Sequence, residues 1–200
     1  MRGVLPSVSH CVRCNASYIL LRDTLGRRYL DCVRVANVHH SAIDVDLDGD
    51  GVAERVAWTA AGSDDAFLAI DENHNGRIDG GHELLGAWRS GPPNGFAALA
   101  ATAAYPRGAT VEPGFVTPRD AIFKRLILWA DADHDGVSDE DEMMSLTYAG
   151  FTKLFLGYQA VGAPDRVGNL FLWNAQALMV SEHGVEVART VTAIALGRSR

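Results

Sequence analysis

Two hundred residues with 48% hydrophobic content can bury a core without a disulfide framework or a structural metal. No window approaches the roughly 18 apolar residues of a membrane span. The Met1–Pro6 segment lacks the sustained apolar run of a secretory signal. We therefore expect no membrane span, and we expect any export to use another signal or a part of the protein outside this sequence.

The net charge of −7 conceals an uneven distribution of acidic residues. Eighteen of the 25 acids fall in the windows 44–54, 64–83 and 131–142, where the single basic residue is Arg77. These windows carry −17 and the remaining residues carry +10. Acids that serve only solubility would be spread over the surface. The clusters therefore predict cation sites, and they disfavour nucleic acid as a partner.

The N-terminal residues contain all three cysteines, Cys11, Cys14 and Cys32. An odd count argues against a full disulfide framework, although one bridge to Cys32 is possible. The Cys11–Cys14 spacing also suits zinc, but a zinc site needs two further ligands. These would be Cys32 with His10, His39 or His40. We expect a disulfide or free thiols rather than zinc.

Short apolar runs rich in β-branched and aromatic residues predict strands along the chain. In order they are Tyr18–Leu21, Tyr29–Val35, Val56–Thr59, Ala66–Ile70, Leu154–Tyr158 and Leu170–Trp173, with further strand or a poorly ordered tail up to residue 200. The alanine-rich segment Phe96–Ala104 predicts a short helix.

The first acidic window predicts a hairpin-like turn over Ile43–Arg55. Its alternating acids are Asp44, Asp46, Asp48 and Asp50. A twelve-residue EF-hand loop needs a glycine at position six and a carboxylate at position twelve. A loop starting at Asp44 or at Asp46 has the glycine, but position twelve is then Arg55 or Ala57. Glu54 is the nearest later carboxylate. A calcium site and a plain acidic turn both remain open.

The second window contains an imperfect EF-hand loop. Its candidate ligands are Asp71, Asn73, Asn75, Arg77 (at position seven), Asp79 and Glu83. Position twelve is His82, and Glu83 follows one residue later. The extra glycine of Gly80-Gly81 would let the loop lengthen so that Glu83 still reaches the ion. Ile78 is the apolar residue through which two such loops pair. A non-binding loop is the alternative.

The third window matches the EF-hand loop at every defining position. Its candidate ligands are Asp131, Asp133, Asp135, the carbonyl of Val137, Asp139 (through water) and Glu142. Calcium is a hard cation that takes six to eight oxygens, which this pattern supplies. The histidines at position four, His74 and His134, are expected to face solvent. An acidic solvated loop is the alternative.

Helices are expected on both sides of the third window. Thr117 suits a helix cap and Pro118 the first helical position, and the residues that share one helical face are Ile122, Phe123, Leu126, Ile127 and Ala130. Met143–Thr147 suggests a second helix that ends at Gly150. The expected fold is therefore α+β, an EF-hand-like helix-loop-helix packed with short β-strands and hairpins. The expected divisions are an N-terminal extension (1–40), the calcium-binding domain (41–175) and a C-terminal strand or tail (176–200).

The ordered set of motifs resembles the EF-hand-like calcium-binding domains attached to bacterial RTX (haemolysin-type) secreted proteins. The segments that carry the resemblance are Asp44–Glu54, Val56–Thr59, Ala66–Asp71, Asn75–Asp79, Glu83–Gly86, Asn94–Leu99, Leu128–Asp131, Asp135–Ser138 and Gly168–Phe171. It covers residues 40–175. One further acidic loop of such domains is missing, because Ala104–Val116 contains only Glu112. Some relatives process themselves at an Asp-Pro bond, and these 200 residues contain none.

The function expected from the sequence is a calcium-binding, calcium-stabilised structural or interaction module of an exported bacterial protein. An enzyme or self-processing relative is disfavoured, because no G-x-S-x-G or H-E-x-x-H motif occurs. A calcium sensor is a further alternative, and it would require an apolar groove that opens on binding. We expect calcium ions as binding partners, at one to three sites. The sequence identifies no protein partner.

Overall fold

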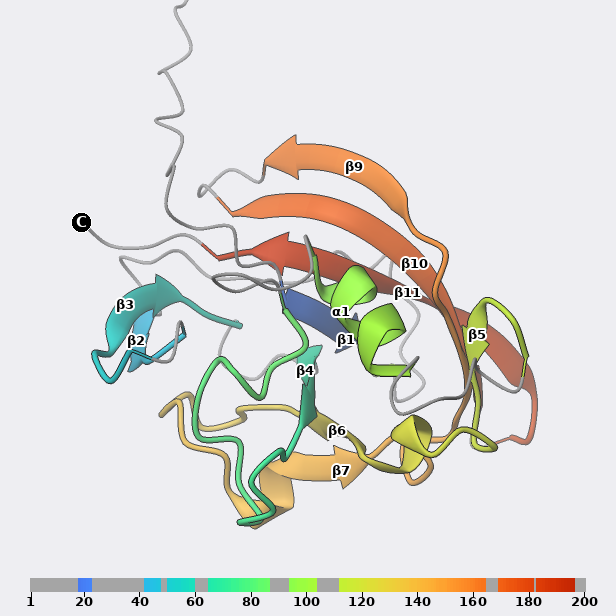
Figure 1. Ribbon diagram of the computed structural model, residues 1–200, viewed down its shortest axis with the longest axis horizontal. Coiled ribbons are helices and arrows are strands. Elements are labelled where there is room, and N and C mark those ends of the chain that lie inside the picture. The colour runs from blue at the N-terminus through green and yellow to red at the C-terminus, as the bar shows by residue number, and fades with distance from the viewer. Residues whose placement is uncertain are drawn as a thin grey trace, which may run out of the picture.

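A computed structural model describes residues 18–22, 42–47, 50–59, 65–86, 94–103, 112–164, 169–181 and 183–196. The predictions for Cys11, Cys14, Cys32 and the strand Tyr29–Val35 fall outside these residues. The described chain is mostly β-structure with one α-helix, α1 (Gly95–Ala103), lying over a large curved sheet (Figure 1). None of its helices is long and apolar enough to cross a membrane.

Nine of the described strands form one sheet, and every pairing is antiparallel. The order is β5 (Phe115–Val116), β8 (Phe151–Phe155), β10 (Leu170–Val180), β11 (Glu186–Ala195), β1 (Tyr18–Arg22), β4 (Asp65–Ile70), β6 (Leu126–Trp129) and β7 (Met143–Ser145). β9 (Gln159–Pro164) pairs with the first half of β10. A separate hairpin of β2 (Ala42–Val45) and β3 (Glu54–Ala57) encloses the first acidic window.

Strand β4 is buried on both faces, since successive side chains of a strand point in opposite directions. Leu68 and Ile70 join the cluster that contains Phe96 and Leu99 of α1. Phe67 joins a second cluster with residues of the β2–β3 hairpin and β6. There the ring centroids of Trp58 and Phe67 lie 4.4 Å apart, and those of Trp58 and Trp129 lie 5.5 Å apart. This second cluster supports the acidic loops.

Most of the predicted strands and the alanine-rich helix are confirmed. The runs that begin at Tyr18, Val56, Ala66, Leu154 and Leu170 overlap β1, β3, β4, β8 and β10, and the helix predicted over Phe96–Ala104 is α1. The last strand, β11, is ten residues long and pairs along nearly all of β10.

The expected helix-loop-helix is wrong, and the α+β fold class with it. Residues Thr117–Arg125 form turns and a three-residue 3-10 helix, Ile122–Lys124, and the next four residues form β6. After the third acidic window, a 3-10 helix (Glu140–Glu142) leads into β7, where Met143 pairs with Trp129 of β6. The third window therefore joins two antiparallel strands.

Strand pairing and a local turn explain why the helix does not form. The run Leu126-Ile127-Leu128-Trp129 is continuously apolar, and its periodicity alone does not distinguish a buried strand from a helix. β6 has hydrogen-bonding partners on both sides, β4 and β7, which satisfy its backbone as a strand. Upstream, the Asp120 carboxylate accepts hydrogen bonds from the Thr117 N–H (2.7 Å) and hydroxyl (2.9 Å) and closes a tight turn.

Candidate metal centre

The three acidic windows contain three loops, which we name by their order: the first loop (Asp46–Glu54), the second loop (Asp71–Glu83) and the third loop (Asp131–Glu142). The first lies in the β2–β3 hairpin, the second follows β4, and the third joins β6 to β7. The end of the second loop returns to β4, where Leu84 forms a β-bridge with Ala69. Each loop is thus held between extended segments rather than between helices.

In the third loop the chain wraps around the Asp131 carboxylate, which is 4% exposed. One of its oxygens accepts the N–H groups of His134 (2.7 Å) and Asp135 (3.2 Å), and the other accepts that of Gly136 (3.0 Å). Gly136 has a φ of 76°, the left-handed conformation that glycine adopts without strain. This turn directs the backbone N–H groups of positions four to six at the Asp131 carboxylate.

Glu142 closes the third loop from its other end. Its carboxylate is buried, accepts the Ala132 N–H at 2.7 Å, and receives the indole N–H of Trp129 at 3.3 Å. Carboxylate oxygens of Asp131, Asp133 and Glu142 all lie within 4.8 Å of one another. Converging carboxylates of this kind suit a hard divalent cation, which prefers oxygen ligands. The donor set therefore fits calcium.

Burial raises the pKa of the Asp131 carboxyl above its ordinary value. The N–H groups of Gly136 and His134 oppose this shift, and the negative charge of Glu142 adds to it. Since the pKa is higher in the folded chain, the charged carboxylate opposes folding once the pH exceeds the unfolded-state pKa, and protonation at low pH removes that cost. A cation bound between the Asp131 and Glu142 carboxylates would favour their charged forms and so offset the cost of burying them.

The second loop repeats the geometry of the third. The Asp71 carboxylate accepts the N–H groups of Asn75 (3.2 Å) and Gly76 (2.9 Å), and Gly76 has a φ of 80°. The Asn73 and Asn75 side-chain amides both donate to Asp79, at 3.3 and 2.6 Å. The polar side chains that the sequence assigns to the second loop therefore gather on one side of the turn.

Glu83 occupies the place in the second loop that Glu142 has in the third, although it comes one residue late. It accepts the Glu72 N–H (2.9 Å) as Glu142 accepts the Ala132 N–H, and both glutamates accept the N–H at position nine. Glu83 is 1% exposed. His82 lies beside the site, with its Nε2 atom 3.9 Å from Asp79, but calcium takes oxygen ligands.

Contact with the first loop explains how the extra residue fits. The Gly81 N–H donates to the Asp46 carbonyl at 2.9 Å. A Cβ atom at Gly81 would lie 2.1 Å from the Leu47 carbonyl oxygen, so only glycine permits this approach. The lengthened backbone of the second loop therefore packs against the backbone of the first.

The structure selects one of the two registers left open for the first loop. Asp46 accepts the N–H groups of Asp50 (3.1 Å) and Gly51 (2.8 Å), as Asp71 and Asp131 do in their loops. Position one is therefore Asp46, and Gly51, with a φ of 86°, is position six. Asp44 lies outside the loop on β2, where it forms an ion pair with Arg55 at 3.2 Å. Asp48 is outside the described residues.

Glu54 closes the first loop three positions early. Its carboxylate accepts the Leu47 N–H at 2.9 Å, the position-two hydrogen bond that Glu83 and Glu142 accept in the longer loops. A twelve-residue spacing does not assign Glu54 as a ligand, although it is the nearest later carboxylate in the sequence. The one feature of the sequence that indicates this closure is the presence of Glu54 eight residues after Asp46.

Other candidate ligands are more exposed, and the position-four histidines differ. In the third loop Asp133 accepts the Asp135 N–H (3.2 Å), Asp135 accepts the Val137 N–H (2.7 Å), and Asp139 lies on the exposed side. His74 is exposed as expected, whereas His134 is half-buried. Three residues at the site are not assigned to it by the sequence pattern: Glu54, Trp129 and Ser138. Tryptophan and serine at these positions are not calcium ligands in an EF-hand loop, so no sequence motif indicates Trp129 or Ser138.

Comparison with known proteins identifies a family and similar curated proteins. The model of the SPM domain family matches residues 30–191 of this chain. The iron-regulated protein FrpA of Neisseria meningitidis serogroup C is 32% identical to this chain over 164 residues. That match covers 70% of this chain and 14% of the relative, so the chain spans a small part of the relative's length.

Proposed function

For this chain, which belongs to the SPM domain family, we propose the role of a calcium-binding module in which bound calcium stabilises the acidic loops. The observation that carries the proposal is the threefold repetition of one hydrogen-bonding pattern. In each loop an aspartate at position one accepts the N–H of the glycine at position six. In each loop a later glutamate accepts the N–H at position two. The repeated hydrogen-bonding pattern, together with the converging carboxylates of the third loop, supports a shared cation-binding role.

The residues that would hold calcium combine this pattern with the ligand positions of the EF-hand loop, and Asp48 is assigned from its sequence position alone. In the third loop they are Asp131, Asp133, Asp135, Val137 (carbonyl), Asp139 and Glu142; in the second, Asp71, Asn73, Asn75, Arg77 (carbonyl), Asp79 and Glu83; in the first, Asp46, Asp48, Asp50 and Glu54. The ion would neutralise the carboxylates, and the protein's part is to hold their oxygens together.

Calcium is expected to raise the melting temperature. A ligand at 100 times its Kd stabilises the folded state by about 2.7 kcal/mol per site, which corresponds to about 5–10 °C for a chain of this size. Thermal unfolding in millimolar calcium, compared with chelator and with the same concentration of magnesium, measures the effect. An identical melting temperature in calcium and chelator would contradict the proposal.

Glu54→Gln is expected to weaken calcium binding in the first loop by about tenfold or more, because it removes the charge of the closing carboxylate. The matched control is Asp44→Asn, which removes a charge from the same hairpin but one paired with Arg55 on β2. The Gly51 amide, which donates to Asp46, reports on this loop in a calcium titration followed by NMR. Equal effects of the two substitutions would contradict the register.

We propose a structural or interaction role for the module rather than catalysis. The 200 residues contain no Asp-Pro bond for self-cleavage of the kind that some similar domains perform. Mass spectrometry of the protein before and after addition of calcium tests this, and new fragments would favour self-processing.

We also propose that the module works outside the cytoplasm in an exported bacterial protein, where calcium is plentiful. Detecting the protein in the culture medium of the bacterium that produces it tests the location.

A further inference from the structure

Ser138, at position eight of the third loop, joins that loop to the second. Its hydroxyl accepts the N–H of Ile78 at 2.7 Å and donates to the Ile78 carbonyl at 3.1 Å. Ile78 is at position eight of its own loop, 60 residues away. Ser138 is 2% exposed and Ile78 is 3% exposed, so water does not compete for these bonds. One hydroxyl satisfies both backbone groups of Ile78.

Ile78 and Ser138 are each followed by an aspartate whose backbone N–H contacts the glutamate that closes its loop. The Asp79 N–H donates to Glu83 at 3.0 Å, and the Asp139 N–H approaches Glu142 at 3.4 Å. A continuous path of hydrogen bonds and peptide units therefore leads from Glu83 through Ile78 and Ser138 to Glu142. A shift of either glutamate toward an ion acts on the backbone that the other glutamate holds.

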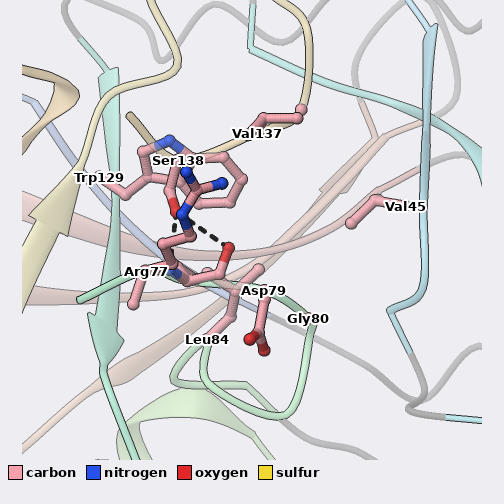
Figure 2. A pocket seen from close by; sticks show the side chains of 10 residues that line it. Val45, Arg77, Asp79, Gly80, Leu84, Trp129, Val137 and Ser138 are labelled. Carbon is pink, nitrogen blue, oxygen red and sulfur yellow. Dashed lines mark hydrogen bonds between the residues drawn. The ribbon is translucent and has the colours of Figure 1, made fainter. Parts of the chain in front are cut away.

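A cavity of about 190 Å³ lies beside this contact (Figure 2). Arg77 and Asp79 of the second loop line it together with Val137 and Ser138 of the third, and Trp129 also borders it. The Ser138 side chain thus lies at the border between the second and third loops.

We propose that the Ser138 hydroxyl couples the second and third loops, so that calcium in one loop raises the affinity of the other. This inference rests on the proposed calcium-binding function. Ser138 supplies no ligand in this arrangement. It acts as a positioning residue, because it holds the Ile78 backbone next to Asp79 and thereby to Glu83. Coupling between sites in proteins ranges from about fivefold to 150-fold in affinity.

Two glycine amides allow each loop to be followed separately. Gly76 donates to Asp71 at 2.9 Å and Gly136 donates to Asp131 at 3.0 Å, so their NMR signals report calcium binding to the second and third loops. In the full chain, Glu142→Gln disables the third loop. We expect it to shift the calcium midpoint of Gly76 upward by at least about fivefold. An unchanged Gly76 midpoint would overturn the coupling.

The same comparison in a Ser138→Ala background identifies the coupling residue. There, Glu142→Gln should leave the Gly76 midpoint unchanged, whereas Ser138→Thr, which keeps the hydroxyl, should retain the shift. Ser145→Ala is the control, since that hydroxyl accepts the Tyr148 N–H in an exposed turn. A shift that persists in Ser138→Ala would show that other contacts couple the loops and would overturn the assignment. Should Ser138→Ala fail to fold, loss of the shift in Ser138→Cys, with its weaker hydrogen-bonding group, supports the assignment, and its retention opposes it.

Failure of the coupling and failure of calcium binding give different results. If the Gly76 and Gly136 signals do not respond to calcium at all, the proposed function is wrong. If both respond, but with midpoints that are independent of each other, calcium binding stands and the coupling does not.

Discussion

Glu142→Gln is expected to raise the calcium Kd of the third loop by about 100-fold, near the upper end of what loss of a supporting group costs a metal site. The substitution removes the charge of a buried carboxylate. It also places an amide NH2 group among N–H donors, since Ala132 and Trp129 both donate to this side chain. Calorimetric titration of the full chain with calcium, together with the Gly136 amide signal, measures the loss.

Glu140→Gln is the matched control for Glu142→Gln. It makes the same chemical change two residues away in the same 3-10 helix, but Glu140 is exposed. We expect its calcium affinity to stay within about twofold of the unchanged protein, since screened surface charges contribute little. Comparable losses in the two variants would mean that general acidity, and not the closing position, attracts the ion.

Gly81→Ala is expected to lower the free energy of unfolding by about 3 kcal/mol, the upper part of the range for an overpacked site. The new methyl group would lie 2.1 Å from the Leu47 carbonyl oxygen and 2.6 Å from the Leu47 Cα, so backbone must move. Movement here also displaces Glu83, which ends the same turn. Denaturant unfolding in chelator measures the stability, and the Gly76 amide signal measures the accompanying loss of calcium affinity in the second loop.

Gly157→Ala serves as the control for Gly81→Ala. A Cβ atom at Gly157 has no heavy atom within 4 Å outside its own neighbours. Its expected effect is between neutral and about 1 kcal/mol of stabilisation, since alanine restricts the unfolded chain. Equal unfolding free energies for Gly81→Ala and the unchanged protein would show that the first and second loops are not packed as described.

The sequence and the structure agree best where ligands are close together in the chain. In the third loop, Asp131 and Glu142 come together through a local turn that the glycine at position six permits, so a pattern of twelve residues contains the necessary information. The local strands and the α1 helix were likewise predictable from short apolar runs.

The sequence was least informative where more distant contacts choose between local alternatives. The run Leu126–Trp129 suits a helix or a strand, and its pairing with β4 and β7 decides for the strand. Glu83 follows the expected ligand position by one residue, and the contact of Gly81 with the first loop accommodates it. The early closure of the first loop by Glu54 follows from the β2–β3 hairpin, whose strands bring Val45 opposite Glu54.

By itself, the sequence determined where acidic oxygens are concentrated and which glycines turn the chain, because both are properties of neighbouring residues. The tertiary structure alone decided that strands and not helices flank the loops, that Glu54 closes the first loop, and that the partner of Ile78 is Ser138. These outcomes depend on strand pairing and on contacts between loops up to 60 residues apart. Ligand spacing indicates that two such loops pair through Ile78, but it describes one segment at a time and does not identify the partner residue.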